Sequence, residues 1–131
     1  MRALRAGKES YAVIAETLRA FAAERYEVEI PIYRMLAAPL DQLRARAEHL
    51  VAATRCKVIE SDCALGGGTT PTETIPSVAI AISGSANDLH ARFLENDPPI
   101  VGRVVKERFT IDVRTLMQDD LEPVAAALKK V

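Results

Sequence analysis

The chain has 131 residues, with 17 basic and 18 acidic side chains and a formal net charge of −1. This length suits one domain and is too short for a TIM barrel or a two-domain Rossmann enzyme, which need about 200 residues or more. A net charge near zero gives no overall field that attracts nucleic acid or acidic lipid. An aromatic content of 5%, without tryptophan, argues against a stacking platform for single-stranded nucleic acid.

Two cysteines, Cys56 and Cys63, lack the C-x-x-C spacing and the companion ligands of a zinc site, so we interpret them as small apolar side chains. The first residues carry charge but no apolar core of a signal peptide. The longest apolar runs, such as Val78–Ile82, are shorter than the roughly 20 residues that span a bilayer. We therefore expect a cytoplasmic protein with no membrane partner.

Two helices are predicted in the first half of the chain. Over residues 8–25, apolar side chains recur at the spacing of one helical face: Tyr11, Ile14, Leu18, Phe21 and Ala22. Residues 24–32 break the pattern, and Pro31 stops any helix that arrives from upstream. Pro39 then stands at a favoured starting position for a second helix over residues 39–54.

From Cys56 onward the apolar period changes to that of strands. Strands are predicted over residues 56–62, 77–83, 100–105 and 108–113, with a loop over 65–76, a helix over 85–95 and a last helix that begins at Asp119. In the second strand Ala79 and Ala81 share a face that would let a helix pack closely. Ser85 and Asp88 resemble a capping box. The last two strands would join at Lys106-Glu107, although type I′ turns prefer Asn-Gly or Asp-Gly.

This order of elements favours an α+β fold, with a mostly antiparallel sheet of about four strands and helices covering one face. We expect a single domain over residues 1–131. Residues 1–38 would form the entering helix and a linker, and residues 39–131 the small α/β domain.

Few residues suggest chemistry by their spacing alone. The run Gly66–Thr70 could offer backbone N–H groups to a phosphate, but it lacks the lysine of a P-loop and a plain loop is the better interpretation. Neither His49 nor His90 has a catalytic partner at a diagnostic spacing. We interpret the acidic pairs as a solvated strand end and a helix start: Glu60 with Asp62, and Asp119 with Asp120. We find no metal site and no catalytic residue.

Arginine is more informative, because the chain has twelve arginines and five lysines and arginine binds carboxylate and phosphate through two parallel hydrogen bonds. Arg2, Arg5 and Lys8 place three positive charges close together. Arg103 lies within a predicted strand, and Arg114 follows one. A solvated or salt-bridged arginine remains the commoner outcome for each of them.

Six stretches resemble, in order and at about the same spacing, the C-terminal part of bacterial selenocysteine synthase, the L-seryl-tRNA(Sec) selenium transferase family. They are Arg2–Lys8, Ile30–Pro39, Leu65–Thr69, Ile75–Ser77, Pro98–Arg103 and Phe109–Thr115. The resemblance implies the small C-terminal domain of a fold-type I enzyme that uses pyridoxal phosphate (PLP). It also implies that the parent enzyme converts seryl-tRNA(Sec) to selenocysteinyl-tRNA(Sec) with selenophosphate and forms a homo-oligomer.

The resemblance further implies that Arg2 and Arg5 help to hold the anionic selenium donor, and that Arg103 binds substrate. The family's Schiff-base lysine belongs to an N-terminal PLP domain that this chain does not contain, so the chain by itself would bind no PLP covalently and would be inactive. Gly7-Lys8-Glu9 also resembles related PLP-dependent ammonia-lyases that act on sugar-acid phosphates. A fragment of such a lyase, and a binding or assembly module without enzymatic activity, remain the alternatives.

Overall fold

The computed structural model describes residues 6–64 and 73–131, and the chain divides into two compact units between Ala38 and Pro39. The first unit holds three helices: α1 (Lys8–Ala22), α2 (Tyr26–Glu29) and α3 (Pro31–Ala37). The predicted first helix ends three residues early. Pro31 ends the helix upstream of it, as predicted, because α2 stops at Glu29. It also occupies the first position of α3, where its missing N–H would have no hydrogen-bond partner within the helix.

A cluster of three aromatic rings joins the helices of the first unit. The ring of Phe21 lies 5.1 Å from that of Tyr26 and 5.3 Å from that of Tyr33, measured between centroids. The predicted apolar face of α1 is nevertheless largely exposed. Its members with more than half of their surface accessible are Tyr11, Ile14 and Leu18.

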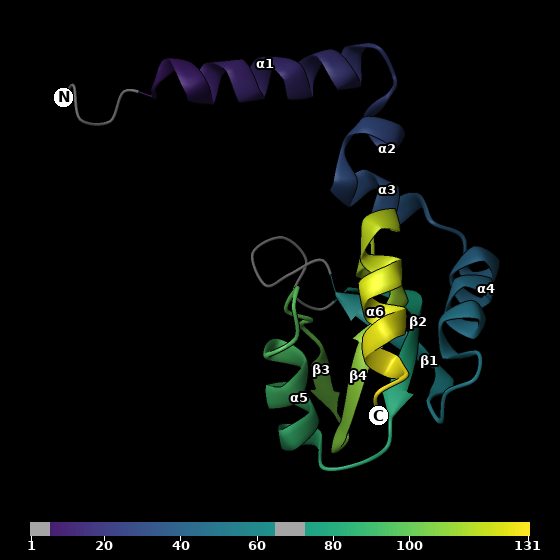
Figure 1. Cartoon of the computed structure of the whole chain (residues 1–131). Coiled ribbons are helices and arrows are strands. Elements are labelled where there is room, and N and C mark those ends of the chain that lie inside the picture. Colours follow the sequence, from purple (N-terminus) through teal and green to yellow (C-terminus); the bar gives the residue numbers. More distant parts are fainter. Residues whose placement is uncertain (1–5, 65–72) are drawn as a thin grey trace. The chain divides into compact units, whose positions relative to one another are not determined.

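The second unit contains a four-stranded sheet in the order β1-β2-β4-β3, in which every neighbouring pair is antiparallel (Figure 1). The strands are β1 (Lys57–Ala64), β2 (Thr74–Ile82), β3 (Arg103–Val105) and β4 (Arg108–Asp112). This confirms the predicted antiparallel sheet.

The second strand begins earlier than predicted and includes Pro76. Because β2 pairs with β4 only over Ala79–Ile82, no neighbouring strand on that side requires an N–H from Pro76. The Pro76 carbonyl instead accepts a hydrogen bond of 2.8 Å from Arg114 Nη2.

Helices cover one face of this sheet, as the fold class predicts. Ile82 pairs with Phe109 across β2 and β4, and the Phe109 ring lies 5.0 Å from that of Phe93 on α5 (Ala86–Leu94). Helix α4 (Leu40–Val51) contacts β1 and β2 on the same face, and α6 (Leu121–Leu128) packs against α4. The helices contribute the core residues Leu43, Ala47, Leu50, Leu89, Phe93, Val124, Ala127 and Leu128.

The opposite face of the sheet, which we call the open face, carries the two alanines. Ala79 pairs with Asp112, and Ala81 pairs with Thr110. The expectation of a helix packed on the alanines is wrong, because α4 and α5 lie on the face of Val78, Ile80 and Ile82. Those larger side chains offer more apolar area to bury. The open face instead carries polar and charged residues.

Local chemistry at two turns differs from the expectation. Ser85 precedes α5, but its side chain makes no capping hydrogen bond, so the predicted capping box is wrong. Lys106 and Glu107 join β3 to β4 in a two-residue turn with φ angles of 49° and 61°, which are the positive values of a type I′ turn. Both residues therefore have positive φ values, which residues other than glycine rarely adopt.

Candidate functional site

A buried carboxylate organises the open face at the end of β4. Asp112 is 7% exposed. Its Oδ1 accepts hydrogen bonds from Ser77 Oγ at 2.6 Å and from the backbone N–H of Arg114 at 3.1 Å. Its Oδ2 accepts one from Arg103 Nη2 at 2.9 Å. These three donors replace the water that the buried charge has lost.

The Arg103 side chain crosses the open face from one edge of the sheet toward the other. Besides Asp112, Nη2 donates to Ser61 Oγ at 3.3 Å and to the carbonyl of Asp62 at 3.2 Å, both on β1. Strands β1 and β3 are the two edges of the sheet, so this one nitrogen connects them. The side chain is 45% exposed. Among the described residues, Nε and Nη1 of Arg103 have no hydrogen-bond partner, so they are available to a ligand.

A hollow of about 580 Å³ lies over this part of the sheet. A volume of this size is in the range of small-molecule sites. Three of its lining residues are cations, which come from β3, the β3–β4 turn and the start of β4. The lining consists of Ile59, Glu60, Ser61, Asp62, Arg103, Val105, Lys106, Arg108 and Thr110.

Two further groups lie close to the Arg103–Asp112 pair. Arg114 is 5% exposed and donates to Pro76, as described above. Burial raises the pKa of the half-buried Cys63 thiol; the charge of Asp112 raises it further, and the charges of Arg103 and Arg114 lower it. A raised pKa leaves little thiolate at neutral pH, so Cys63 does not have the character of a nucleophile.

Most other candidates from the sequence do not gather here. Arg2, Arg5 and the run Gly66–Thr70 lie outside the described residues. His49 is exposed, and the half-buried ring of His90 lies 6.0 Å from that of Phe109 on the helix-covered side of the sheet. Within residues 6–64 and 73–131, no group of three potential metal-ligating side chains comes together.

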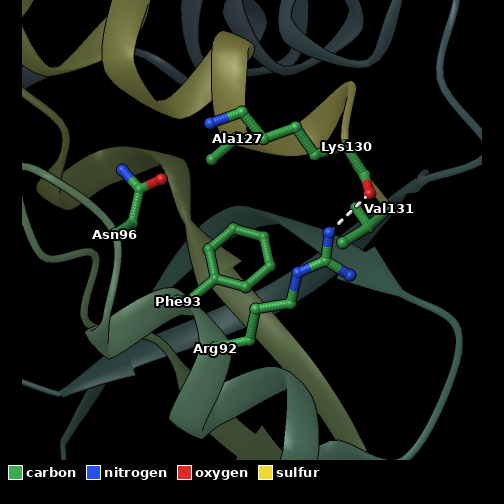
Figure 2. A pocket seen from close by; sticks show the side chains of 6 residues that line it. All are labelled: Arg92, Phe93, Asn96, Ala127, Lys130 and Val131. Carbon is green, nitrogen blue, oxygen red and sulfur yellow. Dashed lines mark hydrogen bonds between the residues drawn. The ribbon is translucent and has the colours of Figure 1, made fainter.

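A second pocket, between α5 and the C-terminal residues, is too small for a substrate. Figure 2 shows Arg92 Nη2 donating to the carbonyl of Lys130, at 2.7 Å, beside the ring of Phe93. The volume of this pocket is about 20 Å³, which is close to the space of one water molecule. We interpret it as a packing feature.

Sequence reasoning found Arg103 but missed its partner Asp112 and the Ser77 hydroxyl that donates to Asp112. Asp112 and Ser77 come from different strands, 35 positions apart in the chain, and only the antiparallel register brings them together. Alternation along β4 was a usable signal, because it places Asp112 on the face opposite to the apolar Phe109 and Ile111. Lys106 and Arg108 gave no signal beyond their charge.

The fold and site thus define a small α+β domain whose exposed sheet face presents an anchored arginine. A family model described as L-seryl-tRNA selenium transferase matches residues 1–117, and the chain belongs to this family. It is 36% identical to the L-seryl-tRNA(Sec) selenium transferase of Nitratidesulfovibrio vulgaris over 98% of the chain, and 37% identical to that of Moorella thermoacetica over 97% of the chain. The counterpart in Geobacter sulfurreducens is 32% identical over the whole chain.

The chain spans only about 30% of the length of these relatives. The relatives therefore contain a large further region. Among the described residues, no helix is both long enough and apolar enough to cross a membrane.

Proposed function

We propose that the chain is the C-terminal portion of a PLP-dependent L-seryl-tRNA(Sec) selenium transferase, which converts seryl-tRNA(Sec) to selenocysteinyl-tRNA(Sec) with selenophosphate. The observation that carries the proposal is the family match over residues 1–117, together with coverage of nearly the whole chain by relatives of that name. The parent would be a cytoplasmic homo-oligomer, with the cofactor and its lysine in the N-terminal region.

The lysines of this chain support the assignment of PLP to that other region. A Schiff-base lysine is desolvated beside its cofactor. All five lysines here are exposed: Lys8, Lys57, Lys106, Lys129 and Lys130. The described residues therefore do not fit a covalent PLP site, and we assign no step of the cofactor's chemistry to them.

The role that we propose for this chain is to hold anionic groups of the substrates. Arg103 is suited to it because Asp112, Ser61 and Asp62 fix one nitrogen of its guanidinium while the other donors remain available. We propose the same role for Arg2 and Arg5 on the basis of the family resemblance. Residues 1–38 would form the segment that enters the small domain of residues 39–131.

A chimera tests the proposal directly. The matching segment of the Nitratidesulfovibrio vulgaris relative is replaced by residues 1–131, and formation of selenocysteinyl-tRNA(Sec) is measured with selenophosphate. We expect activity, and we expect Arg103→Ala to lower kcat/KM. A chimera that retains bound PLP and the oligomeric state of the relative, yet makes no product, would refute the proposal. Activity with a sugar-acid phosphate instead would favour the lyase alternative.

A further inference from the structure

The three cations of the hollow are brought together by one β-hairpin. Arg103 pairs with Thr110, and Val105 pairs with Arg108, so antiparallel register places Arg103 and Arg108 on the same open face. Lys106 occupies the turn at the end of this hairpin and lines the same hollow. All three cations belong to the second unit, within residues 103–108.

The turn maintains this arrangement at a cost in stability. Type I′ turns favour Asn-Gly, because both central residues need positive φ. Here Lys106 and Glu107 take φ values of 49° and 61°, a backbone region that is strained for residues other than glycine. Strained side-chain-bearing residues of this kind concentrate at binding sites, and Lys106 lines the hollow.

The charges around the hollow favour an anion, although acidic groups are present. The lining also includes the acidic residues Glu60 and Asp62 of β1. Glu60 pairs with Val78 and Asp62 pairs with Pro76, so alternation along β1 places both carboxylates on the helix-covered face. Glu60 is paired with Arg44 of α4 at 3.3 Å. Glu107 lies next to Lys106 in the chain, and Asp112 is already occupied by its three donors.

The chemistry of the proposed substrates selects the kind of anion. In seryl-tRNA the carboxyl group of serine is esterified, so it carries no charge for an arginine to bind. The anionic groups that remain are phosphates, either in the tRNA backbone or in the selenium donor. We propose that the hollow on the open face binds a phosphate-type oxyanion through Arg103, Lys106 and Arg108. This assignment of the ligand class rests on the proposed function.

The test measures anion binding to the 131-residue chain by NMR, with titration of inorganic phosphate, thiophosphate, acetate and a short RNA that ends in CCA. We expect phosphate to shift the Arg103 Nε–H signal and acetate to shift it much less. We expect Arg103→Lys to weaken phosphate binding about tenfold, because the guanidinium fork is lost. Lys106→Gln and Arg108→Gln should each weaken it about two- to fivefold.

The control is Lys129→Gln, which removes an exposed lysine outside the hollow and should leave the affinity unchanged. The two Gln variants change exposed residues, so they keep the test valid if Arg103→Lys disturbs the fold. Stronger binding of the RNA than of phosphate would assign the site to the tRNA backbone, and the reverse would assign it to the selenium donor. Equal shifts with acetate, or affinities that do not differ among the variants, would overturn the proposal. An inactive chimera together with specific phosphate binding would count against the proposed function and leave this site in place.

Discussion

Gly102 is the residue that allows β3 to begin close to β4, and its replacement by alanine gives a sharp test of the packing. A methyl group at this position would lie 2.4 Å from Phe109 Cζ and 2.7 Å from the carbonyl oxygen of Thr110. The Phe109 ring is fully buried and is held by Phe93, so it has little room to move. Overpacking of this kind lowers the free energy of unfolding by about 1–3 kcal/mol. Because the methyl group would also meet a backbone oxygen, we expect a loss at the upper end of this range, about 2–3 kcal/mol.

Urea and thermal unfolding of the chain measure this loss. About 2 kcal/mol corresponds to a decrease in Tm of roughly 8–16 °C for a unit of this size. Phe109→Leu removes part of the ring, so the loss caused by Gly102→Ala should be smaller in that background, which a double-mutant cycle detects. A change below about 0.5 kcal/mol for Gly102→Ala, or simple additivity in the cycle, would refute the reasoning.

Replacing Lys106-Glu107 by Asn-Gly should raise the free energy of unfolding by about 1 kcal/mol in urea titrations, because both residues then suit positive φ; a loss of stability would contradict the account of the turn. Glu60→Gln should change stability by less than about 0.5 kcal/mol, because the Glu60–Arg44 pair is exposed, and a loss above 1 kcal/mol on the same assay would show a buried role. Because burial raises the Cys63 pKa, the unfolded chain ionises first, so stability should fall as pH rises above the ordinary thiol pKa of about 8.5. Cys63→Ser should remove this part of the pH dependence in unfolding measured from pH 7 to 10, and an unchanged profile would contradict it.

Local sequence patterns were sufficient for the framework of the second unit. Alternation of Val78, Ile80 and Ile82 predicted the central strand, and the apolar spacing in residues 39–54 predicted α4, because both patterns report which side of one element is buried. The same reasoning failed at Pro76, which was predicted to lie in a loop and instead lies within β2. A proline excludes a hydrogen bond only where a partner would need its N–H, and that depends on neighbours that the local sequence does not reveal.

By itself, the sequence determined the order of the main helices and strands in residues 39–131, the antiparallel α+β class and the resemblance to the selenium transferase family, because these follow from periodicity and from motifs that are local in the chain. It did not predict α2 and α3. Only the tertiary structure decided which face of the sheet the helices cover and which residues surround Arg103. Asp112 of β4 and Ser61 of β1 accept hydrogen bonds from that guanidinium, and Ser77 of β2 donates to Asp112. Their proximity is set by strand order and register, which are properties of pairing between distant segments.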